Sequence, residues 1–435
     1  MKEVHKMTGP KYIKVTEPDV TDNKLSIKIV CSENIKKYFL TDYFFVEYDQ
    51  DVTNVDKSIL SVPIVSNIIT VAWAVGADIY VEELDKTYLD SLSKIKPVFK
   101  EWYPQFSFST NIYVENIVSN QFNRGGYGLL FSGGVDSLTS FIRHKDKHPD
   151  LFTVWGADIP VHENDFWEKV RNRISLFSNT EGVNIHFIKT NMQQLLNQSL
   201  LAREYKLEGW WGPISHGLTL LSLFAPLTTK GIGAMFIASP ERGVCDATNL
   251  LIDNNISWAD VRAVVDGYEL SRHEKIRYII EHPEYLSYLR VCYSSHSDYN
   301  CGRCEKCLRT ITALVLEGVN PKNCNFNIDR KIFGYIKDCL VKGRLPLREN
   351  VELDMWADIQ KHIPEQIEDD PLGYGSKEFF TWFKDFDLSK YKINKLQHFL
   401  WLIAHLVAED GVVKTIKRAP SFIVRSLISH ILNLF

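Results

Sequence analysis

The segment that most constrains how this chain folds is a pair of glycines set between an apolar run and a helical pattern. Residues 129–131 (LLF) predict a buried strand, residues 132–137 read SGGVDS, and the apolar positions that follow predict a helix. Two successive glycines let the backbone turn with positive φ, so that N–H groups at the helix N-terminus can surround an anion. The simpler interpretation is a glycine turn capped by Asp136, with no ligand.

The polar side chains of this segment favour phosphate binding over a plain turn. Ser132 and Ser137 can donate to phosphate oxygens, and a carboxylate at Asp136 is useful beside phosphates mainly when Mg²⁺ lies between them. We therefore predict a strand–loop–helix phosphate site with Mg²⁺. The predicted binding residues are Ser132, Gly133, Gly134, Val135, Asp136 and Ser137. The predicted catalytic residues among them are Ser132, Asp136 and Ser137.

Alternating strand and helix patterns predict an α/β fold. From about residue 125 to residue 318, short β-rich runs alternate with amphipathic helical stretches, which is typical of βαβ units and a parallel sheet. We predict a mixed α+β domain (1–120), a central domain with a parallel sheet (121–320) and a helical domain (321–435). The strands predicted in the central domain are 127–131, 151–155, 183–188, 234–238 and 261–265. The helices predicted before it are 59–75 and 84–102.

Four of the eight cysteines lie close together, with the spacing C-x8-C-x2-C-x2-C. A Cys-x-x-Cys turn lets two thiolates converge on one metal ion, and Gly302 eases that turn. Four sulfur ligands suit tetrahedral Zn²⁺ or a [4Fe–4S] cluster, and an enclosed zinc ion has no open position for substrate, so we predict a structural role. His296, between the first two cysteines, is an alternative ligand. The predicted metal ligands are Cys292, Cys301, Cys304 and Cys307.

The overall charge argues against nucleic acid as the main partner. The 50 Lys and Arg stand against 54 Asp and Glu, a formal charge of -4, whereas proteins that track nucleic acid usually carry a basic surplus. Residues 1–15 lack the apolar stretch of a secretory signal, and the apolar run at 396–408 is interrupted and too short to cross a membrane. We therefore expect a soluble cytoplasmic protein with reduced cysteines and no membrane span.

The SGGVDS segment resembles the signature of the PP-loop ATP pyrophosphatases. Together with the cysteine spacing, it resembles the 7-cyano-7-deazaguanine synthase (QueC) family over about residues 128–318. The resemblance implies an adenine-nucleotide α-hydrolase-like fold, a loop at 132–137 that holds the pyrophosphate of ATP with its Mg²⁺, and Zn²⁺ on the four cysteines. It also implies an ATP-dependent ligase. Such an enzyme adenylates the carboxylate of 7-carboxy-7-deazaguanine, and a nitrogen nucleophile then gives the amide or the nitrile.

The chain departs from that family outside the loop and the cysteines. The family's tyrosine-glycine-glutamine signature after the second strand is replaced by Trp155, Gly156 and Ala157, and its acidic segment after the fourth strand is replaced by residues 239–243 (SPERG). The added N- and C-terminal regions resemble the enlarged QueC-like proteins of bacterial antiphage clusters such as the Qat system. That likeness implies an alternative acceptor, an amine of a partner protein docked on the flanking domains.

Candidate substrate residues follow from the rule that ligands bind at the carboxyl ends of parallel strands. Asp158, Glu241 and Arg242 come after two of the predicted strands. Glu241 can pair with the adjacent donors of a deazaguanine edge, and Arg242 can hold a substrate carboxylate. A solvated loop charge is the alternative interpretation of each. Two other functions stay open, namely tRNA thiolation, which other PP-loop proteins perform, and a binding protein that has lost turnover.

Overall fold

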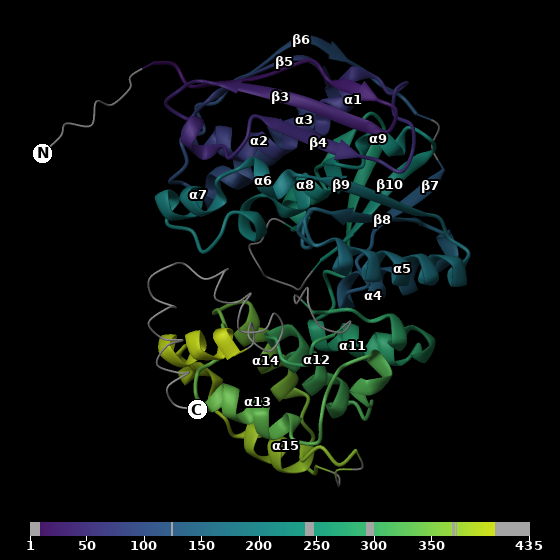
Figure 1. The fold of residues 1–435 in the computed structure, drawn as a ribbon, viewed down its shortest axis with the longest axis vertical. Helices are drawn as coiled ribbons and strands as arrows, with labels where there is room; N and C mark the ends of the chain where they lie inside the picture. The colour runs from purple at the N-terminus through teal and green to yellow at the C-terminus, as the bar shows by residue number, and fades with distance from the viewer. Residues whose placement is uncertain are drawn as a thin grey trace, which may run out of the picture. The chain divides into compact units, whose positions relative to one another are not determined.

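The computed structural model describes residues 9–122, 125–239, 248–292, 300–367, 370 and 372–404. Contacts between Cα atoms divide the chain into two compact units, Met1–Ser271 and Arg272–Phe435 (Figure 1). The first unit is α/β and contains the glycine segment, and the second is helical and contains the four cysteines. The division into three domains stays a prediction, because a unit that is compact by its contacts need not be a domain that folds alone.

The first unit is built on a mixed sheet. Among the described residues it has 12 strands in the order β11-β12-β10-β7-β8-β9-β4-β3-β1-β5-β6, with β2 paired to β3. The five neighbouring strands from β12 to β9 run parallel to one another. They are β7 (Gly126–Leu130), β8 (Asp150–Trp155), β9 (Ile185–Thr190), β10 (Ile232–Ala238) and β12 (Val261–Asp266). The α/β class is confirmed, and each predicted central strand is present within two residues of its predicted bounds.

Helices connect the parallel strands, as βαβ crossovers require. In α5 (Asn164–Glu181), Phe166, Val170, Ile174 and Phe177 are buried at helical spacing, which is why this segment packs on the sheet as a helix. The other α-helices described between β7 and β12 are α4 (Val135–His144), α6 (Met192–Leu195), α7 (Gln198–Tyr205), α8 (His216–Ser222), α9 (Ala225–Thr228) and α10 (Leu250–Asp253). The short strand β11 (Ser257–Trp258) pairs with β12 at the edge.

The N-terminal residues add strands to the same sheet. These strands are β1 (Tyr12–Val15), β2 (Asp19–Thr21), β3 (Lys24–Cys31), β4 (Tyr43–Glu47), β5 (Asp78–Asp85) and β6 (Ile112–Val118). The predicted helices are present as α1 (Lys57–Leu60) with α2 (Val62–Val75), and as α3 (Lys86–Trp102). Asp85 caps α3, because its carboxylate accepts from the N–H of Tyr88.

Side chains extend the short antiparallel pairing of β4 with β9, which joins the N-terminal strands to the parallel block. The ladder itself has only two residue pairs. Beyond one end, Asn191 accepts from the N–H of Phe45 (2.9 Å) and donates to the carbonyl of Tyr43 (2.7 Å). Beyond the other end, the carboxylate of Asp49 accepts from the N–H of Phe187 (3.2 Å). Polar side chains therefore supply the hydrogen bonds that a longer ladder would have made.

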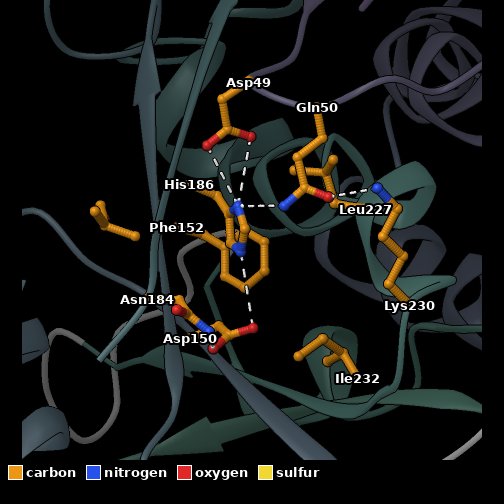
Figure 2. A pocket seen from close by; sticks show the side chains of 10 residues that line it. Asp49, Gln50, Asp150, Phe152, Asn184, His186, Leu227, Lys230 and Ile232 are labelled. Carbon is orange, nitrogen blue, oxygen red and sulfur yellow. Dashed lines mark hydrogen bonds and ion pairs between the residues drawn. The ribbon is translucent and has the colours of Figure 1, made fainter. Parts of the chain in front are cut away.

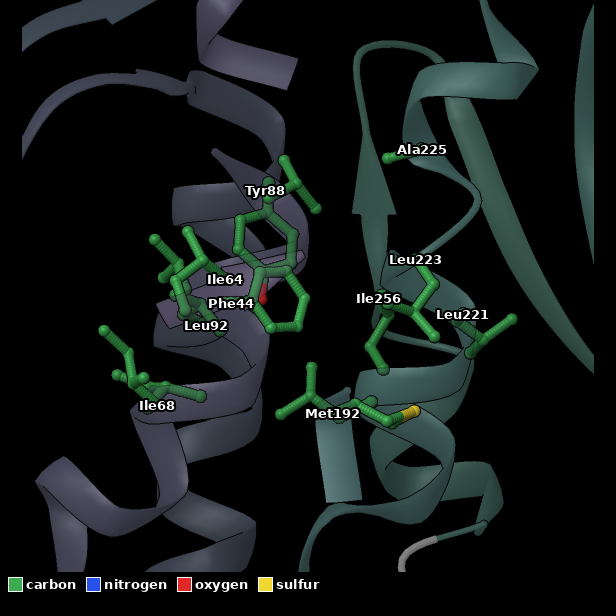
Figure 3. Packing of buried hydrophobic residues seen from close by; sticks show 14 of the residues in the cluster. Phe44, Ile64, Ile68, Tyr88, Leu92, Met192, Leu221, Leu223, Ala225 and Ile256 are labelled. Carbon is green, nitrogen blue, oxygen red and sulfur yellow. The ribbon is translucent and has the colours of Figure 1, made fainter. Parts of the chain in front are cut away.

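One hydrophobic core underlies both parts of this sheet. Figure 3 shows Phe44, Ile64 and Tyr88, from β4, α2 and α3, on one side, with Leu221 and Met192 on the other. All belong to a single buried cluster that also contains residues of β10 and β12. The N-terminal residues and the central residues thus share apolar contacts, and this burial stabilises the joined sheet.

The second unit packs helices around aromatic side chains. Its labelled helices are α11 (Arg272–Ile280), α12 (Glu305–Leu316), α13 (Ile332–Val341), α14 (Glu352–Lys361) and α15 (Ser376–Lys384), and residues 395–404 are also helical. Three 3-10 turns accompany them, η4 (Pro283–Tyr288), η5 (Pro321–Cys324) and η6 (Leu388–Lys390). Phe383 packs edge-on against Trp356 at 5.8 Å between ring centroids, and both side chains are fully buried. None of the described helices in either unit is long and apolar enough to cross a membrane.

Candidate functional site

The SGGVDS segment forms the turn between β7 and α4, as predicted. Gly133 has a left-handed φ of 72°, a conformation that favours glycine, and Gly134 is the N-cap of α4. The hydroxyls of Ser132 and Ser137 lie 3.3 Å apart, and the Ser137 Oγ also accepts from the N–H of Ser132. Ser132 is exposed, whereas Ser137 is buried. The two hydroxyls therefore lie together at the start of the helix, where its dipole is positive.

Backbone donors in this turn are available for a ligand. The N–H groups of Gly133 and Val135 donate to no acceptor within the described residues. The N–H of Gly134 makes only a long contact, 3.4 Å, with the Ser132 hydroxyl. Free N–H groups at a helix N-terminus attract anions and suit phosphate oxygens.

Sheet topology places this turn where ligands bind in open α/β sheets. The parallel strands follow the order β12-β10-β7-β8-β9, so β7 is central and successive strands are added on its β8 side before the chain crosses to β10 on the other side. The strand order reverses between β7 and β10. A crevice at the carboxyl ends of the two strands on either side of such a reversal is the usual ligand site. Residues 132–137 directly follow the carboxyl end of β7 and therefore lie at this crevice.

A buried polar network fixes α4 against the end of β12. The Asp266 carboxylate accepts from the Ser140 hydroxyl (2.7 Å), and its other oxygen lies 3.0 Å from Nε2 of His144 and 3.3 Å from Nε of Arg143. Burial raises the pKa of Asp266, but the hydrogen bonds from His144 and Ser140 outweigh burial, and the net shift is downward. The ionised carboxylate thus holds the helix that follows the turn at residues 132–137. Sequence reasoning missed Asp266, because nothing distinguishes a single aspartate at a strand end.

The candidate substrate residues have different outcomes. Asp158 is exposed in the turn after β8, on the same edge of the sheet as residues 132–137. That turn requires a glycine, since Gly156 has a φ of 110° and a Cβ there would overlap the carbonyl of Thr190. Glu241 and Arg242 lie outside the described residues. Of the three candidates, Asp158 is thus the one that the structure describes, and it lies at the predicted edge.

A histidine that sequence reasoning did not single out also lies at this edge. His216 begins α8, directly after a π-helical turn, η3 (Trp211–Ser215), and α8 runs back toward the amino end of β10. Its Nδ1 lies 2.6 Å from the hydroxyl of Thr248. π-helical turns inside helices are frequent at functional sites. No motif marks His216 in the sequence, so its place is visible only in the fold.

A second cluster of ionisable groups in the first unit lies at the opposite edge. A cavity of about 360 Å³ is lined by residues that include Asp150, Ile185 and Ile232, which are the first residues of β8, β9 and β10. In Figure 2, His186 lies between the carboxylates of Asp49 and Asp150, at 3.3 Å and 3.7 Å. These groups pair with one another, and the cavity is at the amino ends of the strands, away from residues 132–137.

The second unit brings all four predicted metal ligands together. The Sγ atoms of Cys292, Cys301, Cys304 and Cys307 lie within 4.8 Å of one another, and all four residues are buried. The Sγ separations are 4.0 Å from Cys292 to Cys304 and 3.8 Å from Cys301 to Cys307. Four thiolates at about 2.3 Å from one tetrahedral ion lie about 3.8 Å apart, so this cluster fits a single metal ion. The group could hold a metal such as zinc.

Backbone N–H groups donate to this cluster, and its thiols shift one another's pKa values. The N–H groups of Arg303 and Cys304 both donate to Sγ of Cys301, at 3.4 Å and 3.3 Å. Hydrogen bonds from the neighbouring thiols, Cys301 first, lower the pKa of Cys292, whereas hydrogen bonds to Cys292 and Cys304 raise the pKa of Cys301. Four thiols this close cannot all ionise unless a cation compensates the charge. His296, the alternative ligand, lies outside the described residues.

A buried ion pair supports the helix that carries the last two cysteines. Arg309 donates to Glu305 at 2.7 Å, one turn away on α12, and both side chains are less than one-tenth exposed. Trp356 on α14 donates to the same carboxylate at 3.0 Å. This network ties the cysteine cluster to the aromatic core of the second unit.

Comparison of the chain with protein-family models, with curated proteins and with solved structures finds no match. The site must therefore be interpreted from its own geometry.

Proposed function

We propose that this chain is an ATP-dependent ligase of the PP-loop type, which transfers AMP to a carboxylate and then lets a nitrogen nucleophile displace it. The observation that carries the proposal is the SGGVDS turn at the point where the strand order reverses, with free N–H groups and two hydroxyls at the N-terminus of α4. A phosphate-binding turn at this position of a parallel sheet is the arrangement by which doubly wound folds hold nucleotides.

Five of the six residues of the turn have a role in this proposal. The N–H groups of Gly133 and Val135, with the hydroxyls of Ser132 and Ser137, hold the pyrophosphate of ATP. Asp136, in the first turn of α4, holds Mg²⁺, which supplies positive charge to the departing pyrophosphate. The substrate carboxylate attacks the α-phosphorus, and AMP then leaves when the nitrogen nucleophile attacks the carbonyl carbon. Preorganised donors favour this reaction, because they need not reorient as charge develops.

The proposed substrate is 7-carboxy-7-deazaguanine, from the resemblance to the QueC family in the loop and in the cysteine spacing. The acceptor is ammonia, which gives the amide, and a second adenylation on the amide oxygen with loss of AMP gives the nitrile. The alternative acceptor is an amine of a partner protein, as the resemblance to antiphage QueC-like proteins suggests. Asp158 and His216 are the described polar residues that we assign to the substrate side, since both lie at the carboxyl edge of the sheet.

Thiolation of tRNA has less support, because it needs a reactive cysteine. Among the described cysteines outside the cluster, burial raises the pKa of Cys324 to about 12 and of Cys339 to about 11, and it also raises the pKa of Cys31. Thiols with raised pKa values are poor sulfur carriers at neutral pH. We propose Zn²⁺ rather than [4Fe–4S] for the cluster, because four thiolates on four separate iron ions lie further apart than thiolates on one ion.

The test is product analysis by mass spectrometry after incubation with ATP, Mg²⁺ and 7-carboxy-7-deazaguanine, with and without ammonia. We expect an adenylated deazaguanine without ammonia, and free AMP together with an amide or nitrile when ammonia is present. Asp136→Asn should abolish AMP formation and keep the zinc of the four cysteines. The control Asp146→Asn, which changes an exposed carboxylate at the other end of the same helical segment, should remain active. If ATP turnover does not depend on the deazaguanine, the substrate proposal is wrong.

A further inference from the structure

The second unit contains a cavity that the proposed reaction does not use. Its volume is about 680 Å³, within the range of ligand sites, about 300–1,000 Å³. Three segments line it: Gly302 and Arg303 of the cysteine cluster, residues 327–335 at the start of α13, and residues 374–378 at the start of α15.

The wall of this cavity is part of the metal cluster's own loop. Gly302 has a φ of 69°, and it packs so closely on the carbonyl of Asn327 that a Cβ could not be accommodated. The fully buried side chain of Asn300 donates to the carbonyls of Leu289 (2.8 Å) and Cys324 (3.0 Å). The cavity is therefore preformed, and a ligand would lose little free energy in ordering it.

Three cations lie on the rim without a carboxylate partner. Arg303, Arg330 and Lys331 are exposed, and no acidic group of the described residues lies within ion-pair distance of any of them. The guanidinium of Arg303 lies over the ring of Tyr335, 5.6 Å from the centroid, which restrains its direction. Lys331 is also the N-cap of α13, whose first turn has no side-chain cap and adds positive potential.

The two acidic side chains of the lining offset only part of this charge, because three cations stand against two carboxylates. Asp329 accepts from the backbone N–H of Lys331 at 2.7 Å and pairs with no cationic side chain among the described residues. Glu378 comes from α15 and is exposed. The floor is apolar, because Ile328 and Ile332 are buried side chains in the lining.

The tyrosines of the lining are not platforms for nucleobases. Tyr374 is only 4% exposed, and its hydroxyl donates to Asn320. Tyr335 has Arg303 over its ring, and its hydroxyl accepts from Nε1 of Trp401 at 2.7 Å. Single-stranded nucleic acid needs open aromatic faces on which bases stack, and neither ring offers one. Cations above an apolar floor suit a polypeptide that alternates acidic and apolar side chains.

We propose that this cavity binds an acidic peptide segment of a partner protein. The segment's carboxylates lie on Arg303, Arg330 and Lys331, and one apolar side chain lies on the floor formed by Ile328 and Ile332. The proposal goes beyond the ligase activity, since it requires neither ATP nor residues 132–137.

Fluorescence anisotropy of a labelled peptide, Glu-Leu-Glu-Asp-Leu, tests this with the full-length, metal-loaded protein. The comparison probes are the same peptide with Gln and Asn in place of its acids, and a single-stranded RNA dodecamer. We expect the acidic peptide to bind at least about tenfold more tightly than the amide peptide, and more weakly as salt is raised from about 50 mM to about 300 mM.

Variants locate the site. Arg330→Gln should weaken binding of the acidic peptide about fivefold or more, and the double variant Arg303→Gln/Arg330→Gln should weaken it further. Lys361→Gln removes an exposed cation at the end of α14, outside the cavity, and should leave binding unchanged. Metal content, measured for each variant, separates loss of the site from loss of the fold. No binding by the wild type, equal binding of the amide peptide, tighter binding of RNA, or indifference to Arg330 would each overturn the proposal.

Discussion

Deprotonation of His186 should weaken the junction between β4 and β9. His186 lies on β9 with Asp49, which follows β4, on one side and Asp150 of β8 on the other. Burial lowers the pKa of the imidazole, but hydrogen bonds to Asp150 and Asp49 outweigh burial and raise the pKa to about 9. Because folding raises the pKa, the stabilisation is complete below about pH 6.5 and is lost as the pH rises through about 9.

The size of the effect follows from the same shift. A rise from 6.5 to about 9 would correspond to about 3 kcal/mol at about 1.36 kcal/mol per unit. The carboxylates are 30% and 26% exposed, so solvent screens the pair. We therefore expect His186→Gln to lower the free energy of unfolding by about 1–2 kcal/mol at about pH 6.

Urea unfolding, followed by tryptophan fluorescence at about pH 6 and about pH 10, measures this difference. The difference between wild type and His186→Gln should shrink at about pH 10 to a few tenths of a kcal/mol. Subtracting the variant from the wild type at each pH cancels the titration of other groups. The control His162→Gln removes an exposed histidine, and its effect should be small at both pH values. An equal loss from His186→Gln at both pH values would refute the electrostatic explanation.

Three further predictions concern the metal cluster, its support and the turn after β8. Cys304→Ser should lower zinc content and folded yield together, as measured by atomic emission and soluble expression, because a structural metal contributes folding free energy; normal yield without zinc would contradict this. Glu305→Ala should destabilise the second unit by about 3 kcal/mol in thermal unfolding, since it leaves the Arg309 guanidinium buried without its partner; a loss below about 1 kcal/mol would show that water reaches the arginine. Gly156→Ala should lower the free energy of unfolding by about 2 kcal/mol or more, because the φ of 110° at Gly156 and the carbonyl packed against it both exclude a Cβ.

The local signals in the sequence predicted the parallel strands, the phosphate-loop turn and the cysteine cluster. Each of these depends on residues close together in the chain, such as Gly133 beside Gly134, or on a spacing that itself brings ligands together, as in Cys301-x-x-Cys304. The folded chain confirms the turn and brings the four thiols within 4.8 Å. Their proposed ligands, ATP with Mg²⁺ and Zn²⁺, stay predictions.

The features that sequence reasoning missed depend on single polar residues far apart in the chain. Asn191 joins β9 to β4 through hydrogen bonds to the backbone of Phe45 and Tyr43, and no local pattern distinguishes it from a surface asparagine. Asp266 holds α4 through Ser140 and His144, across more than 120 positions of the sequence. Such pairings are set by the packing of the whole sheet, so they cannot be read from periodicity or from local propensity.

Isotope transfer tests the central claim, adenylation of a carboxylate, most directly. The protein would be incubated with ATP, Mg²⁺, ammonia and 7-carboxy-7-deazaguanine labelled with ¹⁸O in its carboxylate, and the AMP would be analysed by mass spectrometry. If the carboxylate attacks the α-phosphorus, each AMP formed carries one ¹⁸O atom from the substrate. Unlabelled AMP, or ADP in place of AMP, would contradict the account, because the oxygen on the α-phosphorus would then come from water or the cleavage would occur at the γ-phosphate.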